Sequence, residues 1–100
     1  EILKNDPEVD AIFFCNDDLA QGALLAAQRL KIKVPQQLAI AGFNDLTGSN
    51  LIGPGLTTIR TPRAAIGQAA SQMLLALMRK EEVASPSVDV GYQLMVRGST

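Results

Sequence analysis

The sequence predicts an α/β fold built on a parallel sheet. Two continuous apolar runs, AIFFC at residues 11–15 and LAIAGF at residues 38–43, are separated by a stretch with helical periodicity. Strand, helix and strand together take roughly 30 residues, which is the length of one βαβ unit with two parallel strands.

The first apolar run follows Asp6-Pro7, a pair that ends the short helix predicted at the start of the chain. Because residues 11–15 are apolar throughout, they predict a strand buried on both faces. Cys15 then packs inside the strand as an unreactive side chain.

The helix predicted at residues 18–31 has an apolar stripe that should face the core. Asp17 or Asp18 is the predicted N-cap, because Asp18 and Gln21 have the spacing of a capping box. The stripe consists of Leu19, Ala23, Ala26 and Leu30.

The second half of the chain alternates polar loops with apolar segments. NDLTGSNLIGPG at residues 44–55 predicts a loop, and LTTI at residues 56–59 predicts a short strand. Thr61 is the predicted N-cap of a second long helix that starts at Pro62. Residues 88–100 predict a last strand, broken at Gly91. The second helix should turn one face to a core, namely Ile66, Ala70, Met73 and Leu77.

Composition excludes several functional classes. Nine basic residues stand against ten acidic ones, the net charge is -1, and no basic cluster fits a phosphate backbone. Without histidine and with one cysteine, a disulfide framework and the usual zinc sites are excluded. No apolar run approaches the roughly 20 residues of a membrane span. We expect a cytoplasmic protein without a cofactor, and, since the chain opens at Glu1 in what reads as a helix, a fragment of a longer one.

Two amide side chains follow the two predicted parallel strands. Asn16 comes after the first strand and Asn44 after the second, and open α/β sheets bind ligands at the carboxyl ends of their strands. Short amides carry donors and acceptors that suit a polyhydroxylated ligand. In the alternative interpretation each asparagine makes an Asx turn, and the spacing leaves both interpretations open.

The same strand ends offer carboxylates for an enzyme. Asp17, Asp18 and Asp45 could hold Mg²⁺ for phosphoryl transfer. The chain lacks the histidine, glycine-rich phosphate loop, nucleophile elbow and strand-end lysine that such chemistry uses. We therefore predict that the protein is not an enzyme.

A few residues indicate a contact between subunits. Leu25 lies on the side of the first long helix that carries Gln21, away from the expected core, and Leu51 and Ile52 are apolar inside a polar loop. Together they predict an interface between two copies of the chain.

Several motifs in fixed order resemble a known family. DAIFFCNDDLAQGALLAAQRLKIKVPQQLAIAGFND, then GLTTIRTPRAAIGQAASQMLLALM, then LMVRGST are similar to the carboxy-terminal portion of the effector-binding core of the lactose/galactose repressor family. The resemblance covers essentially all 100 residues. NDLTGSNLIGPGLTTIRTPR is most similar to the gluconate-operon repressors within that family.

The resemblance implies a fold of two lobes like that of periplasmic sugar-binding proteins, with the effector between the lobes. Residues 1–60 and about 94–100 would belong to the C-terminal lobe, and residues from about 62 to 92 to the N-terminal lobe. Asn16 and Asn44 take effector-binding positions. The helix that starts at Asp18, with Gln21 and Leu25, and the Leu51-Ile52 segment take positions used for homodimerisation. Operator DNA would be bound by an upstream helix-turn-helix, and no residue of this chain is assigned to DNA.

The resemblance also directs the prediction of the effector. Many relatives carry an acid where Asn44 stands, and an acid would repel the carboxylate of a sugar acid. We therefore expect an anionic effector, gluconate or its phosphate, with Arg60 or Arg63 as the counter-charge. The main alternative is a periplasmic-type sugar-binding protein for transport, which shares the fold. A magnesium-dependent phosphoryl-transfer domain is the second alternative.

Overall fold

The computed structural model describes all 100 residues, which form two compact units. Unit 1 comprises Glu1–Arg60 and Gln93–Thr100, and unit 2 comprises Thr61–Tyr92. The assignment of such units to two lobes stays a prediction. The elements in chain order are α1 (Ile2–Asn5), β1 (Ala11–Phe13), α2 (Asp17–Arg29), β2 (Ala39–Phe43), β3 (Thr57–Arg60), α3 (Arg63–Met78) and β4 (Gln93–Met95).

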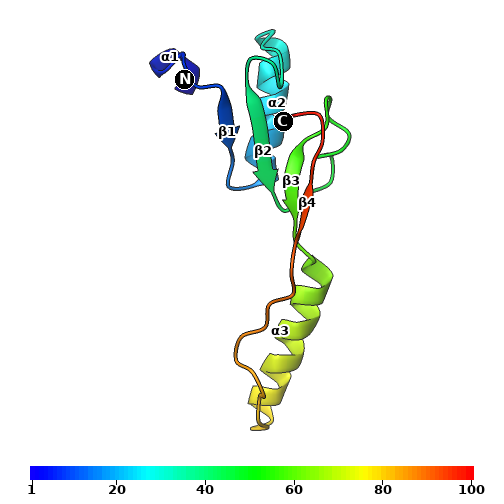
Figure 1. Cartoon of the computed structure of the whole chain (residues 1–100). Helices are drawn as coiled ribbons and strands as arrows, with labels where there is room; N and C mark the ends of the chain where they lie inside the picture. Colours follow the sequence, from blue (N-terminus) through cyan, green and yellow to red (C-terminus); the bar gives the residue numbers. More distant parts are fainter. The chain divides into compact units, whose positions relative to one another are not determined.

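Unit 1 is built on a sheet with the strand order β1-β2-β3-β4 (Figure 1). β1 pairs with β2 in parallel, with Ile12 opposite Ile40, and β2 pairs with β3 in parallel, with Gly42 opposite Thr58. The predicted parallel βαβ unit is therefore confirmed. β4 closes the sheet by pairing with β3 in the antiparallel sense.

The core of unit 1 lies between α2 and β2, and it uses a different face of α2 from the predicted one. The predicted stripe is wrong: Leu19 is 54% exposed and Leu30 is 70% exposed. The helix has apolar side chains on a wide arc, so two neighbouring stripes are both compatible with its sequence. The stripe that is buried contains Asp17, Ala20, Leu24 and Ala27.

β1 is shorter and less buried than the sequence suggests. Phe13 is 63% exposed, and Cys15 lies beyond the strand with an exposed side chain. The predicted burial on both faces is therefore wrong. β1 is the edge strand of the sheet, because it pairs with β2 only. A continuous apolar run is typical of a strand whose two faces are both covered, and within this chain β1 lacks that cover.

The end of the chain joins β2 to β3. Ser99 Oγ donates to the Ile40 carbonyl at 2.5 Å and accepts from the Thr57 amide at 2.8 Å. The backbone of Ser99 also accepts from the Ile40 amide at 2.8 Å. The fully buried Ser99 thus satisfies polar groups of two strands at once.

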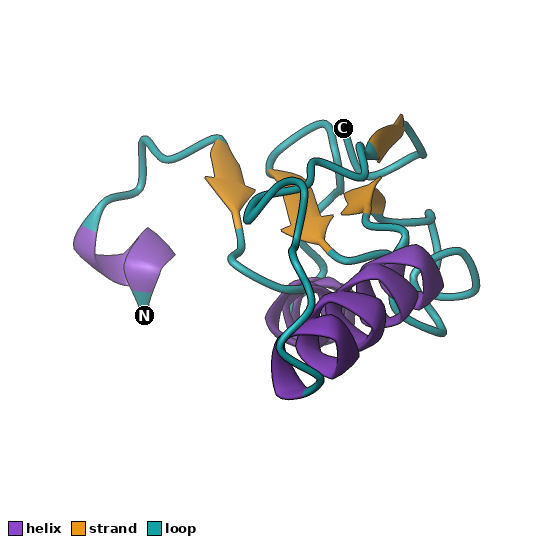
Figure 2. Cartoon of the chain, turned by 90° about the horizontal axis from the view of Figure 1, so that it is seen from below, coloured by secondary structure: helices purple, strands orange, loops and turns teal.

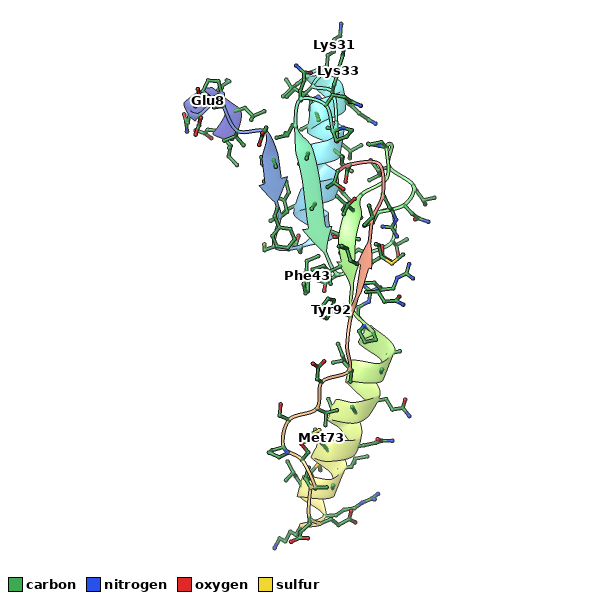
Figure 3. All side chains as sticks on the ribbon, in the orientation of Figure 1. Glu8, Lys31, Lys33, Phe43, Met73 and Tyr92 are labelled. Atoms are coloured by element: carbon green, nitrogen blue, oxygen red, sulfur yellow. The ribbon has the colours of Figure 1, made fainter.

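Unit 2 consists of α3 and the segment that returns along it (Figure 2). Pro62, not Thr61, is the N-cap residue, and no side chain caps the helix. No residue of α3 is buried, and Leu77 is 62% exposed, so the predicted core face does not form within this unit. Met73 helps to line a hollow of about 300 Å³, and Figure 3 shows this side chain beside the returning segment.

Of the last strand predicted at residues 88–100, only the three residues of β4 form a strand. Gly91 has a φ of 77°, and the residues before it pair with no other strand. None of the helices combines the length and the apolar character that crossing a membrane requires.

Candidate functional site

The carboxyl ends of β1, β2 and β3 lie at one edge of the sheet in unit 1, because these three strands are parallel. Asn16 follows β1, Asn44 and Asp45 follow β2, and Arg60 ends β3. Figure 3 marks this edge by Phe43, while Lys31 and Lys33 lie at the opposite end of the unit. The structure therefore brings three of the four predicted effector residues to one edge.

Asn16 is the N-cap of α2, which corrects the prediction that Asp17 or Asp18 takes this position. Its Oδ1 accepts from the Leu19 amide at 3.0 Å. The extended backbone of Asn16, with φ of -154°, is typical of an N-cap. Capping uses the acceptor of the amide, so the donors that Asn16 can offer a ligand are on Nδ2.

Asp17 lies inside the unit rather than on its surface. Its side chain is fully buried and accepts from three donors: the Leu46 amide at 2.8 Å, Ser49 Oγ at 2.5 Å and Thr58 Oγ1 at 2.6 Å. A buried carboxylate needs such donors, because an unsatisfied one would be costly. Asp17 therefore ties the start of α2 to the loop after β2 and to β3.

Asn44 and Asp45 turn the chain away from β2 in an unusual backbone conformation. Their φ angles are 105° and 51°, values that favour glycine. The Asn44 amide donates to the Ile59 carbonyl at 2.8 Å, and the Asp45 amide donates to Thr58 Oγ1 at 3.3 Å. The turn is thus held to β3 on both residues.

Asp45 forms ion pairs with two arginines. Arg60 Nε lies 2.6 Å from Asp45 Oδ2, and Arg97 Nη1 lies 2.8 Å from Asp45 Oδ1. Burial raises the pKa of Asp45, but the hydrogen bonds and positive charges of Arg97 and Arg60 outweigh it, and the pKa lies below the usual 3.8. Arg97 also donates to the Leu56 carbonyl at 2.9 Å, which anchors its guanidinium group.

Arg63 is the remaining predicted effector residue, and it belongs to unit 2. It is the first residue of α3, its side chain is exposed, and its amide donates to the Thr61 carbonyl at 2.9 Å. The predicted binding role of Arg63 stays a prediction, as do those of Asn16, Asn44 and Arg60.

The predicted dimer residues occupy different environments. Leu25 is 50% exposed and Leu51 is 77% exposed, whereas Ile52 is partly buried against the core. Gln21 donates from Nε2 to Ser49 Oγ at 2.9 Å and to the Thr47 carbonyl at 3.3 Å. Its amide thus holds the loop after β2, and the role of these four residues between subunits stays a prediction.

The three carboxylates of the magnesium alternative do not form a metal-binding group. Asp17 is committed to three donors inside the unit, Asp45 is paired with Arg60 and Arg97, and Asp18 is exposed. This arrangement gives no support to the phosphoryl-transfer alternative.

Sequence reasoning missed Asp17 and Arg97 as organisers of this edge. The available signal for Asp17 was its phase on α2, since it lies three, seven and ten residues before Ala20, Leu24 and Ala27. Arg97 gave no comparable signal, because its partners Asp45 and Leu56 are far away in the sequence.

Comparison with known proteins identifies the family of the chain. Residues 1–100 match the family described as periplasmic binding protein-like domain. The chain belongs to this family. Its α/β class, with a sheet that is mostly parallel, is therefore confirmed as the periplasmic-binding-protein-like fold that the resemblance implied.

Relatives within the family are transcriptional regulators. The HTH-type transcriptional regulator GntR from Pseudomonas aeruginosa is 55% identical over 100 residues, which are 100% of this chain and 29% of that protein. The crystal structure of transcription regulator GntR from Chromobacterium violaceum is 52% identical, with a TM-score of 0.88, over 97% of this chain and 36% of that one. A complex of transcriptional regulator CelR with cellobiose is 26% identical, with a TM-score of 0.89, over 99% of this chain and 30% of that one.

These findings confirm the resemblance to the lactose/galactose repressor family. The chain spans only about a third of the length of these relatives, 29% of the first and 36% of the second.

Proposed function

We propose that the chain is the effector-binding and dimerising part of a cytoplasmic transcriptional repressor, with gluconate or a similar sugar acid as the effector. It catalyses no reaction and controls operator DNA through an upstream DNA-binding domain. The relatives described above are regulators, which favours a repressor over a transport protein of the same fold.

The observation that carries the proposal is the strand-end edge of unit 1. Adjacent parallel strands β1 and β2 end in Asn16 and Asn44, at the place where open α/β sheets bind ligands. Nδ2 of Asn16 supplies donors, and the side-chain amide of Asn44 stands where the resemblance to the repressor family implies an acid in many members. Hydroxyl groups of a sugar acid match such donors and acceptors.

The charge of the edge bears on the choice between a sugar acid and a neutral sugar. One carboxylate and two guanidinium groups meet at Asp45, Arg60 and Arg97, so this cluster keeps one positive charge. Asp17 and Asp18 add two carboxylates at the start of α2, and these repel an anion. Binding of a neutral hexose must therefore be compared with binding of the sugar acid. An anionic effector is attracted by the cluster and avoids an acid at position 44.

The test is Asn44→Asp in the intact protein, with binding of gluconate and glucose measured by titration calorimetry. A new carboxylate 4 Å from that of gluconate costs about 4 kcal/mol at an effective dielectric constant of about 20. Gluconate affinity should therefore fall strongly at neutral pH. The matched control is Asn50→Asp, which makes the same change at an exposed position of the same loop. Unchanged gluconate affinity in Asn44→Asp would sink the charge argument.

Dimerisation is the second part of the proposal, supported by the exposed Leu25 and Leu51. Replacing both by lysine should weaken self-association in sedimentation experiments, because an interface would have to bury two unpaired ammonium groups. Leu30→Lys is the control, since Leu30 is 70% exposed at the end of the same helix. A double variant that stays dimeric at the concentrations of the parent would rule out this interface.

A further inference from the structure

We propose that Asp17 is a positioning residue for effector binding, which sets the conformation of Asn44 without contacting the effector. This inference rests on the proposed function of the strand-end edge. Asp17 is fully buried, and its three donors come from the loop after β2 and from β3. The carboxylate oxygens therefore accept hydrogen bonds inside the unit and are not available to a ligand.

The link from Asp17 to Asn44 runs through Leu46. The Leu46 amide donates to Asp17 Oδ2 at 2.8 Å, and it follows directly after the two residues with positive φ. Non-glycine residues keep such a conformation only where the surroundings hold them on both sides. β3 holds the turn at Asn44, through the Ile59 carbonyl, and Asp17 holds it at Leu46.

A second hold passes through Thr58 and Ser49. Thr58 Oγ1 donates to Asp17 Oδ1 at 2.6 Å and accepts from the Asp45 amide at 3.3 Å. Ser49 Oγ donates to Asp17 Oδ2 at 2.5 Å and accepts from Gln21 Nε2 at 2.9 Å. Asp17 thus fixes the turn directly at Leu46 and indirectly at Asp45.

The fold keeps space for this carboxylate. Gly42 lies in β2 beneath Asp17, and a Cβ at this position would collide with Asp17 Oδ1. The same Cβ would lie 3.1 Å from Ala20 Cβ and 3.1 Å from Leu56 Cδ2. Glycine at position 42 therefore leaves the space that the Asp17 carboxylate occupies.

The test is Asp17→Asn in the intact protein, at a temperature where the variant is folded. In asparagine the NH₂ group that replaces one carboxylate oxygen cannot accept a hydrogen bond, so the remaining oxygen faces three donors and at least one donor is lost. We expect gluconate affinity to fall by about tenfold or more, which corresponds to losing one hydrogen bond to a charged group. Asp18→Asn is the control, since it makes the same change at the exposed neighbour.

A double-mutant cycle with Asn44→Ala separates positioning from general stability. If Asp17 acts through Asn44, adding Asp17→Asn to Asn44→Ala should weaken gluconate binding by little more than Asn44→Ala does alone. Effects that simply multiply would overturn the proposal. So would an Asp17→Asn variant that has a lower melting temperature and the gluconate affinity of the parent.

Amide hydrogen exchange provides a readout that needs no ligand. The Leu46 amide should exchange faster in Asp17→Asn than in the parent, while the Leu30 amide, bonded to the Ala26 carbonyl at 2.9 Å, keeps its rate. An unchanged Leu46 rate would overturn the proposal. If the parent binds no gluconate, the proposed function fails, and the exchange rates still decide whether Asp17 holds the turn.

A milder pair of variants covers the case in which Asp17→Asn does not fold. Thr58→Val removes one donor to Asp17, whereas Thr58→Ser keeps it. The valine variant should speed Leu46 exchange and weaken gluconate binding relative to the serine variant. Equal behaviour of the two would count against the proposal.

Discussion

Unit 1 and unit 2 handle apolar side chains differently. Unit 1 buries a cluster centred on Leu24, Ile40 and Leu56, and it satisfies its buried polar groups internally. Unit 2 buries no residue, although α3 carries exposed leucines at positions 74, 75 and 77. Unit 1 is therefore specified by contacts that its own residues make, whereas most apolar residues of α3, these leucines included, are left exposed within their own unit.

The difference shows what a helix needs besides an apolar sequence. α2 is buried where β2 lies under it, and Asp17 ties its first turn to two other segments. α3 is more apolar on average than α2. Most of the stability of a helix in a protein comes from its packing rather than from its propensity, and unit 2 offers α3 only the returning segment to pack against. Substitutions in the two units should therefore differ in their effects.

Truncation of a leucine should give the largest contrast. Leu24→Ala removes a side chain that is 1% exposed and should lower the free energy of unfolding by about 2–5 kcal/mol. Leu77→Ala, at 62% exposure, should change it by about 0.5 kcal/mol or less in the 100-residue chain. Urea unfolding followed by circular dichroism measures both. Similar losses from the two variants would remove the distinction between the units.

Addition of a methyl group should give a smaller contrast. Gly42→Ala forces a Cβ against Ala20, Leu56 and Asp17, and overpacking of this kind costs about 1–3 kcal/mol. Gly67→Ala, where nothing lies within 4 Å, should stabilise α3 by up to about 1 kcal/mol. Thermal unfolding of the two variants decides the matter. A neutral Gly42→Ala would show that β2 and α2 are not closely packed.

The ion pairs of Asp45 should give the smallest effect and a dependence on pH. Because the pKa of Asp45 is lower in the folded state, its pairs stabilise the fold fully above the usual value of 3.8, and this gain is lost as pH falls through the lower folded pKa. At pH 7, Asp45→Asn should be about 1–2 kcal/mol less stable than the parent. Urea unfolding at a series of pH values should show this gap closing in acid. A gap that stays constant to strongly acidic pH would show that the charge of Asp45 does not contribute.

The sequence was sufficient for those features that depend on local patterns. Apolar runs and helical periodicity predict β1, α2 and β2 in order, and the parallel pairing then brings Asn16 and Asn44 to one edge. The resemblance to the repressor family added the chain's place in a larger fold. These predictions needed no knowledge of which side chains touch.

The features that were predicted wrongly depend on distant contacts. Two neighbouring stripes of α2 are apolar, and the sheet beneath the helix selects the one with Leu24. Asn16 caps α2 because Asp17 is drawn inward by donors from Leu46, Ser49 and Thr58, which lie 29 to 41 residues away in the sequence. The prediction that β1 is buried on both faces was wrong because a continuous apolar run does not show which other elements cover a strand.

The most direct test of the central claim, that the strand-end edge binds an anionic effector, is titration calorimetry of the intact parent protein with gluconate and with glucose. We expect saturable binding of gluconate at neutral pH and much weaker binding of glucose, because the cluster of Asp45, Arg60 and Arg97 keeps a positive charge and Asn44 adds no carboxylate. Binding of glucose as tight as that of gluconate, or no binding of gluconate at all, would contradict it.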